Sequence, residues 1–239
     1  MSMQIEQAVT TEEIAALAAE RLAAILAEAV EQRGQAHLAV SGGHTPGLMF
    51  AALATRRVPW RAIHLWQVDE RVVARTSAER NLVQLRRDLV AKVPVPDDHV
   101  HAMPVDGRDL EAGAAAYAAA MVDAGAEVLD AVHLGLGDDG HTASWPPHDP
   151  VLRIRGADVA VVGPFHGLLR MTLTPPAVNR ARNVLFLVTG RDKAQVVAQL
   201  LGANQVLPAS RVRNERTVLC LGGGAEAGAV AWRGAARPS

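Results

Sequence analysis

The densest group of chemically capable residues lies in segment 137–144, which reads GDDGHTAS. Asp138, Asp139 and His141 place two carboxylates and an imidazole on this glycine-flanked segment. Histidine is the side chain whose unperturbed pKa, ~6.5, suits a base near neutral pH, and an adjacent carboxylate can fix its tautomer. The segment therefore predicts general-base chemistry by His141 with Asp139 beside it. The alternative is that the aspartates cap a following helix and His141 is incidental.

A second candidate is the glycine-rich segment 41–47, which reads SGGHTPG and follows a short apolar run. Gly42 and Gly43 allow the backbone to approach a ligand closely, and free N–H groups at the start of a helix favour an anion such as phosphate. Thr45 adds a hydroxyl donor. The pattern is neither the dinucleotide fingerprint nor the P-loop, so an ordinary tight turn stays open as an alternative.

Charged residues also lie beside three other apolar runs. Asp69 and Arg71 come directly after one run, and Arg170 is the first residue of the segment RMTLT. Lys193 stands at a strand-to-helix turn, and the chain contains only one other lysine, Lys92. A compact ammonium suits a phosphate as a point charge. For Asp69 and Arg71 a local ion pair at a solvated strand end is the alternative, and for Lys193 a solvated helix start.

Helices and strands must position these residues, and the hydrophobic pattern of the sequence predicts a regular series of both. Residues 12–32 have helical spacing, and Thr10 with Glu13 forms a capping box before them. Short apolar runs predict strands, and the stretches between them predict helices. The predicted strands are 36–40, 63–68, 131–136, 159–162, 171–174, 184–189 and 218–221, and the further helices are 46–54, 77–91, 110–124, 176–181 and 192–201.

Alternating strands and helices predict an α/β fold, a single Rossmann-like domain over residues 1–239. Its open, mostly parallel sheet is expected to carry helices on both faces. In such sheets a ligand binds outside the carboxyl ends of the strands, which is where the candidate residues fall. No linker, charge run or fixed-period repeat indicates a second domain.

Composition narrows the function classes. The 239 residues are 49% hydrophobic and 21% charged, with net charge −1 and 3% aromatics, so nucleic acid is an unexpected partner. No apolar run approaches the roughly 20 residues that span a bilayer, so no membrane partner is expected. The single cysteine and the absence of a secretory pattern in the first residues predict a cytoplasmic protein.

Taken together, four segments resemble the 6-phosphogluconolactonase family, within a wider group that includes glucosamine-6-phosphate deaminases and ribose-phosphate isomerases. The segments are SGGHTP (41–46), DERVV (69–73) with Asn81 downstream, LGLGDDGHTASWPP (134–147) and RMTLTPPAVNRARNVLFLVTGRDKA (170–194). They occur in the order typical of the family, and the resemblance extends to about Ser210.

The resemblance implies hydrolysis of 6-phospho-D-glucono-1,5-lactone to 6-phospho-D-gluconate by an enzyme that needs no cofactor and no metal. It implies that His141 activates water, Asp139 positions His141, and Asp69 and Arg71 line the site. The residues expected to hold the phosphate are Gly42, Gly43, Thr45, Arg170 and Lys193. The expected partner is the small sugar-phosphate lactone, and the expected state is a monomer or weak homodimer.

Three alternatives remain at this stage. A sugar-phosphate deaminase or isomerase of the same group needs a further acid, and the glutamate of the deaminases is absent from WPPHDP at 145–150, where His148 and Asp149 are imperfect substitutes. A non-catalytic sugar-phosphate-binding protein would lack His141. A metal hydrolase could draw on His99 and His101 or on His141 with Asp138 and Asp139. The Pro/Asp-rich surroundings of His99 and His101 are more typical of a turn entering a short strand. Trp145 departs from the family pattern and is expected to reshape the pocket floor.

Overall fold

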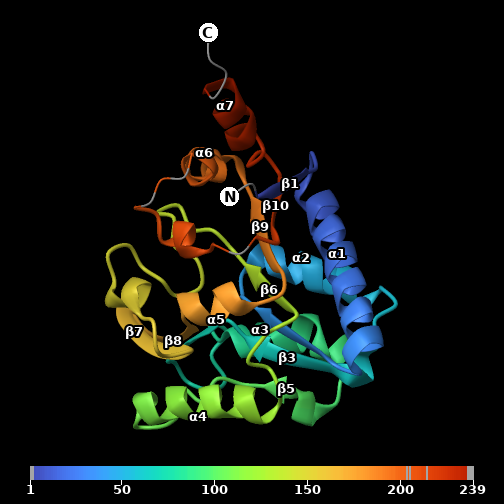
Figure 1. The fold of residues 1–239 in the computed structure, drawn as a ribbon, viewed down its shortest axis with the longest axis vertical. Helices are drawn as coiled ribbons and strands as arrows, with labels where there is room; N and C mark the ends of the chain where they lie inside the picture. The colour runs from blue at the N-terminus through green and yellow to red at the C-terminus, as the bar shows by residue number, and fades with distance from the viewer. Residues whose placement is uncertain (1–2, 203, 205, 214, 236–239) are drawn as a thin grey trace.

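A seven-stranded parallel sheet forms the centre of the computed structural model, which describes residues 3–202, 204, 206–213 and 215–235 (Figure 1). The strand order is β1-β10-β9-β6-β2-β3-β5. Every neighbouring pair is parallel, which confirms the predicted sheet. Both ends of the predicted 1–239 domain lie outside the described residues. The strands are β1 (Gln4–Gln7), β2 (Ala36–Val40), β3 (Ile63–Gln67), β5 (Val100–His101), β6 (Ala131–Leu134), β9 (Val184–Thr189) and β10 (Thr217–Gly222).

A second, three-stranded antiparallel sheet corrects the prediction for the middle of the chain. It has the order β4-β8-β7, with β4 (Asp69–Arg71), β8 (Leu168–Leu173) and β7 (Val159–Phe165). The sequence pattern places the runs 159–162 and 171–174 in the parallel sheet. Their apolar pattern is the same as that of the main strands, but a connection of only two residues between β7 and β8 permits a hairpin and excludes a parallel crossover. In Figure 1 this hairpin lies on the opposite side of the molecule from α1.

Helices cover both faces of the parallel sheet, as expected from alternating strands and helices. The helices are α1 (Thr11–Arg33), α2 (His44–Ala54), α3 (Asn81–Asp88), α4 (Leu110–Asp123), α5 (Pro175–Arg180), α6 (Ala194–Leu201) and α7 (Ala227–Ala235). Successive residues of a strand point to opposite faces, so Leu38 and Val40 belong to the hydrophobic cluster that includes α1 and α2. Ala39 belongs to the cluster that includes α4 to α7 and the small sheet. The sequence pattern does not predict β1, β4 or α7, and it gives no strand range for β5.

The first helix shows why its prediction succeeded. The Thr10 side chain accepts a hydrogen bond from the Glu13 N–H, and the Glu13 carboxylate accepts one from the Thr10 N–H, each at 3.1 Å. Gly34 ends the helix in the left-handed conformation, at φ 80°. Both signals are local, so the sequence carries them without help from the rest of the fold.

Candidate active site

A cavity of about 260 Å³ opens at the carboxyl edge of the parallel sheet. Segments after β2 and β6, the strands β4 and β8, the first residue of α3 and the turn after β9 line it. The cavity brings together six of the predicted site residues: Gly42, Asp69, Arg71, His141, Arg170 and Lys193. A larger cavity, of about 660 Å³ beside Arg75 and Asp106, is lined by none of the residues predicted for the site.

His141 sits on the loop after β6 with one ring nitrogen already engaged. Its Nδ1 lies 2.6 Å from Asp139 Oδ1, and the same oxygen accepts the His141 backbone N–H at 3.0 Å. With the Nδ1 proton on this bond, Nε2 is left as the acceptor that a general base needs. Gly137 makes room for the ring, because a Cβ there would lie 2.0 Å from Nδ1.

Asp139 is suited to this positioning role. Partial burial of the carboxylate opposes its ionisation, but the hydrogen bonds from the backbone and ring of His141 outweigh burial and lower the pKa of Asp139. An ionised carboxylate fixes the tautomer of the imidazole and stabilises the imidazolium that forms when the base takes a proton.

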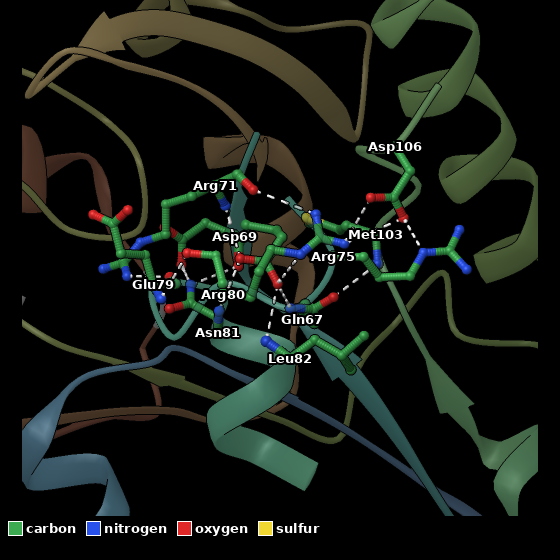
Figure 2. Close-up of polar contacts among 12 residues, drawn as sticks. Gln67, Asp69, Arg71, Arg75, Glu79, Arg80, Asn81, Leu82, Met103 and Asp106 are labelled. Atoms are coloured by element: carbon green, nitrogen blue, oxygen red, sulfur yellow. Dashed lines mark hydrogen bonds and ion pairs between the residues drawn. The ribbon is translucent and has the colours of Figure 1, made fainter. Parts of the chain in front are cut away.

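Asp69 is a different kind of carboxylate, because it lies beneath the cavity with 5% of its surface exposed. Burial raises its pKa, against the lowering effects of the Ser144 hydroxyl and of the Arg71 and Arg170 guanidiniums. Ser144 Oγ donates to Asp69 Oδ2 at 2.6 Å, and Asn81 Nδ2 donates to Asp69 Oδ1 at 3.2 Å. Figure 2 shows Asp69 and Asn81 side by side.

The second sheet places two arginines opposite each other across β4 and β8, where Arg71 pairs with Arg170. Arg71 Nη1 donates to the Glu79 carbonyl at 2.6 Å. Arg170 Nη1 lies 4.0 Å from Asp69 Oδ2, and its guanidinium carbon lies 5.0 Å from the centre of the Phe165 ring. Like charges held this close on one wall of a cavity favour an anionic ligand.

Lys193 completes the cationic group from the short turn after β9, the 3₁₀ segment Arg191–Lys193. Its ammonium forms an ion pair with Asp138 and lies 3.8 Å from Asp192 Oδ2. Lys193 and His141 therefore meet at one cavity although they come from separate strand ends. Asp138, which the sequence placed beside the base, contacts Lys193 instead.

Two predicted phosphate ligands do not line the cavity. The Gly43 N–H donates to Gln84 Oε1 at 2.8 Å, and Thr45 Oγ1 is 2.7 Å from Thr189 Oγ1. Their expected role stays a prediction. The sequence does not predict Ser144 or Gln84 as site residues, although Ser144 belongs to the GDDGHTAS segment. Asn81 enters the sequence analysis only as a residue downstream of the DERVV motif.

The remaining sequence candidates lie elsewhere. His148 and Asp149 line a separate cavity of about 270 Å³. Trp145 is fully buried in the core, where Nε1 donates to the Leu173 carbonyl at 2.7 Å, so it does not form the pocket floor. His99 and His101 contact His64, at ring-centre distances of 3.8 and 5.3 Å.

In residues 3–202, 204, 206–213 and 215–235, no group of three or more His, Cys, Asp or Glu side chains is placed to hold a metal ion. Within the same part of the chain, no helix is long and apolar enough to cross a membrane.

An imidazole with a carboxylate partner and three cationic side chains line one cavity at the carboxyl edge of a parallel sheet, which is the arrangement expected of an α/β enzyme for an anionic substrate. Comparison with known proteins gives the family. The chain belongs to the family described as glucosamine-6-phosphate isomerases/6-phosphogluconolactonase, whose model matches residues 9–220.

Individual relatives agree with this family. A 6-phosphogluconolactonase of Synechocystis is 38% identical over 181 residues, which cover 73% of this chain and 75% of the relative. A 6-phosphogluconolactonase of Mycobacterium tuberculosis is 37% identical over 215 residues, covering 84% and 87%. The crystal structure of a 6-phosphogluconolactonase from Thermotoga maritima superposes with a TM-score of 0.83 at 25% identity, covering 92% of this chain and all of the other.

Proposed function

We propose that this chain hydrolyses 6-phospho-D-glucono-1,5-lactone to 6-phospho-D-gluconate, the second step of the oxidative pentose phosphate pathway. The observation that carries the proposal is the 2.6 Å contact between His141 Nδ1 and Asp139 in a cavity that Arg170 and Lys193 also line. The names of the relatives agree with this reaction.

The chemistry follows from the geometry of the base. His141 Nε2 takes a proton from a water molecule as its oxygen adds to the lactone carbonyl carbon. The bond between that carbon and the ring oxygen then breaks, and the imidazolium returns its proton to the departing oxygen. The products are the open-chain acid and a free hydroxyl, so one water is consumed and the base is regenerated. Asp139 stabilises the imidazolium between the two steps.

Cations anchor the substrate at its phosphate end. Lys193 and Arg170 form charge-assisted bonds with the phosphate, and the turn that contains Gly42, Gly43 and Thr45 lies beside them. Arg71 contacts substrate oxygens above Asp69. Because the phosphate contacts are the same in the ground state and the transition state, they govern binding, whereas His141 governs the rate of the chemical step.

A single comparison of substrates tests the proposal. Purified protein is mixed with freshly generated phospholactone, and proton release is measured against the spontaneous reaction. Ammonia release from glucosamine 6-phosphate is measured in parallel. We expect fast lactone hydrolysis and no ammonia, because a deaminase needs a further acid and both His148 and Asp149 line another cavity. Ammonia release would favour the deaminase, and hydrolysis no faster than the spontaneous rate would favour a binding protein.

Cytoplasmic location and a monomeric or weakly dimeric state stay predictions from the sequence. Sedimentation of the purified protein over a range of concentrations tests the second.

A further inference from the structure

Glu70 is a fully buried carboxylate in β4, between the two cavity residues Asp69 and Arg71. Its two oxygens each accept two hydrogen bonds. Oε1 accepts the N–H groups of Arg71 and Asn81, both at 2.8 Å. Oε2 accepts Gln67 Nε2 at 2.8 Å and the Leu82 N–H at 2.9 Å. All four partners are donors, so the position requires a group that only accepts.

Arg80 adds a positive charge to this cluster. It is 2% exposed, its Nε lies 3.9 Å from Glu70 Oε2, and its Nη1 donates to the Arg71 carbonyl at 3.4 Å. Figure 2 shows Arg80, Asn81 and Leu82 converging with Arg71 and Gln67. Four donors and a cation thus surround this carboxylate, whereas an amide in its place would turn an NH₂ group toward two donors.

The effect of Glu70 reaches the cavity through α3. This helix begins at Asn81 with no side-chain cap from its own N-cap residue, Arg80. Glu70 supplies the missing acceptor from β4. Asn81 then donates to the Asp69 carbonyl at 2.8 Å, and on its other side it excludes any side chain at Gly42, where a Cβ would lie 2.1 Å from Asn81 Oδ1.

Gln84 extends the connection to the glycine turn. Its Oε1 accepts the Gly43 N–H at 2.8 Å, and its Nε2 donates to the Gly43 carbonyl. Gly43 has φ 129°, a conformation that glycine adopts and L side chains rarely do. The Gln84 side chain of α3 therefore bonds both the N–H and the carbonyl group of Gly43.

We propose that Glu70 and Gln84 are positioning residues for the active site. Glu70 fixes β4 and the start of α3, and Gln84 transmits that placement to the glycine turn, so one buried carboxylate aligns Asp69 and Arg71 with the turn proposed to bind phosphate. The inference for Gln84 depends on the phosphate-binding role given above.

Gln84→Met removes both bonds to Gly43 at similar side-chain length. We expect KM for the phospholactone to rise about 3- to 30-fold, the effect of losing two neutral hydrogen bonds, with kcat changed less than about threefold. KM for unphosphorylated gluconolactone should stay the same. Gln199→Met, on the exposed side of α6, is the matched control and should leave both values unchanged.

Glu70→Gln tests the other end of the connection. We expect kcat to fall about 10- to 100-fold on both lactones, because Asp69 and Arg71 lose their alignment at the reacting centre. Activity is expressed per folded molecule, with the folded fraction taken from circular dichroism well below the unfolding temperature. Glu111→Gln, an exposed substitution of the same kind, is the control.

Three outcomes would overturn the inference: KM and kcat unchanged per folded molecule in both variants, equal effects of Gln84→Met on the two lactones, or an unchanged exchange rate at Gly43 in Gln84→Met. The last is measured by amide hydrogen exchange without substrate, and faster exchange is expected. The exchange measurement separates the positioning role of Gln84 from the proposed function. If the wild-type protein hydrolysed neither lactone, the proposed function would be wrong, but exchange at Gly43 would still test the role of Gln84.

Discussion

Two histidines on β6 and the loop that follows it have opposite environments. His133 is fully buried, and neither of its ring nitrogens has a hydrogen-bond partner among the described residues. His141 keeps 28% of its side-chain surface exposed, and its Nδ1 is hydrogen-bonded to Asp139. Burial lowers the pKa of His133 to about 3, so it stays neutral and serves as a packing residue against Phe50.

The comparison teaches that chain position relative to the sheet edge decides what a histidine does. Inside a central strand, flanking strands and helices exclude water and charge. Past the carboxyl end of the strand, the loop supplies a carboxylate and a cavity. The predictions below test this contrast, beginning with the largest effect.

Replacing His141 should have the largest effect. His141→Asn removes the base, and we expect kcat for the phospholactone to fall ~10²–10⁴-fold with little change in KM. Stopped-flow proton release measures both values. His148→Asn, in a separate cavity, is the matched control. A nearly normal kcat in His141→Asn would remove this residue as the base.

Replacing Lys193 separates anchoring from chemistry at the same cavity. Lys193→Ala should raise KM about 10- to 150-fold, the effect of losing a charge-assisted contact, and Lys193→Arg should restore part of it. KM for unphosphorylated gluconolactone should change little. Lys92→Ala, at the chain's other and exposed lysine, is the control. Equal loss on both lactones would contradict the phosphate assignment.

His133 should affect stability rather than activity. Burial lowers the folded-state pKa of His133 to about 3, against ~6.5 in the unfolded chain. The free energy of unfolding is therefore full above pH ~6.5 and falls as the pH drops from there toward about 3. At pH 5 the unfolded state gains about 2 kcal/mol from protonation of this one residue. His133→Leu should remove that loss and change kcat at pH 7 less than about twofold.

Urea unfolding at pH 7 and pH 5 measures the difference. His166→Leu, at an exposed histidine, is the control and should keep the wild-type pH dependence. If His133→Leu loses as much stability as wild type between the two pH values, burial of His133 is not a source of acid sensitivity.

Treatment with a chelator should have no effect on the rate of lactone hydrolysis. In the proposed reaction Nε2 of His141 activates water as a base while Nδ1 is held by Asp139, so EDTA should leave hydrolysis unchanged. Activity before and after dialysis against EDTA is the measurement. If EDTA abolished activity and a divalent cation restored it, the result would favour the metal-hydrolase alternative.

Local signals in the sequence determined much of this protein. The capping box and Gly34 define α1, and short apolar runs give five of the seven parallel strands at least in outline, because helix caps and hydrophobic periodicity act over a few residues. The His141 and Asp139 pair was also readable, since the two residues are close in the chain and bond within one loop.

The tertiary structure alone decided the rest. The start of α3 at Asn81 rather than at residue 77 depends on Glu70, a cap that comes from another strand. The pairing of Arg71 with Arg170 requires the antiparallel sheet, and burial of Asp69 and His133 requires the whole core. These features join residues far apart in the chain, and hydrophobic periodicity carries no information about which distant segments pair.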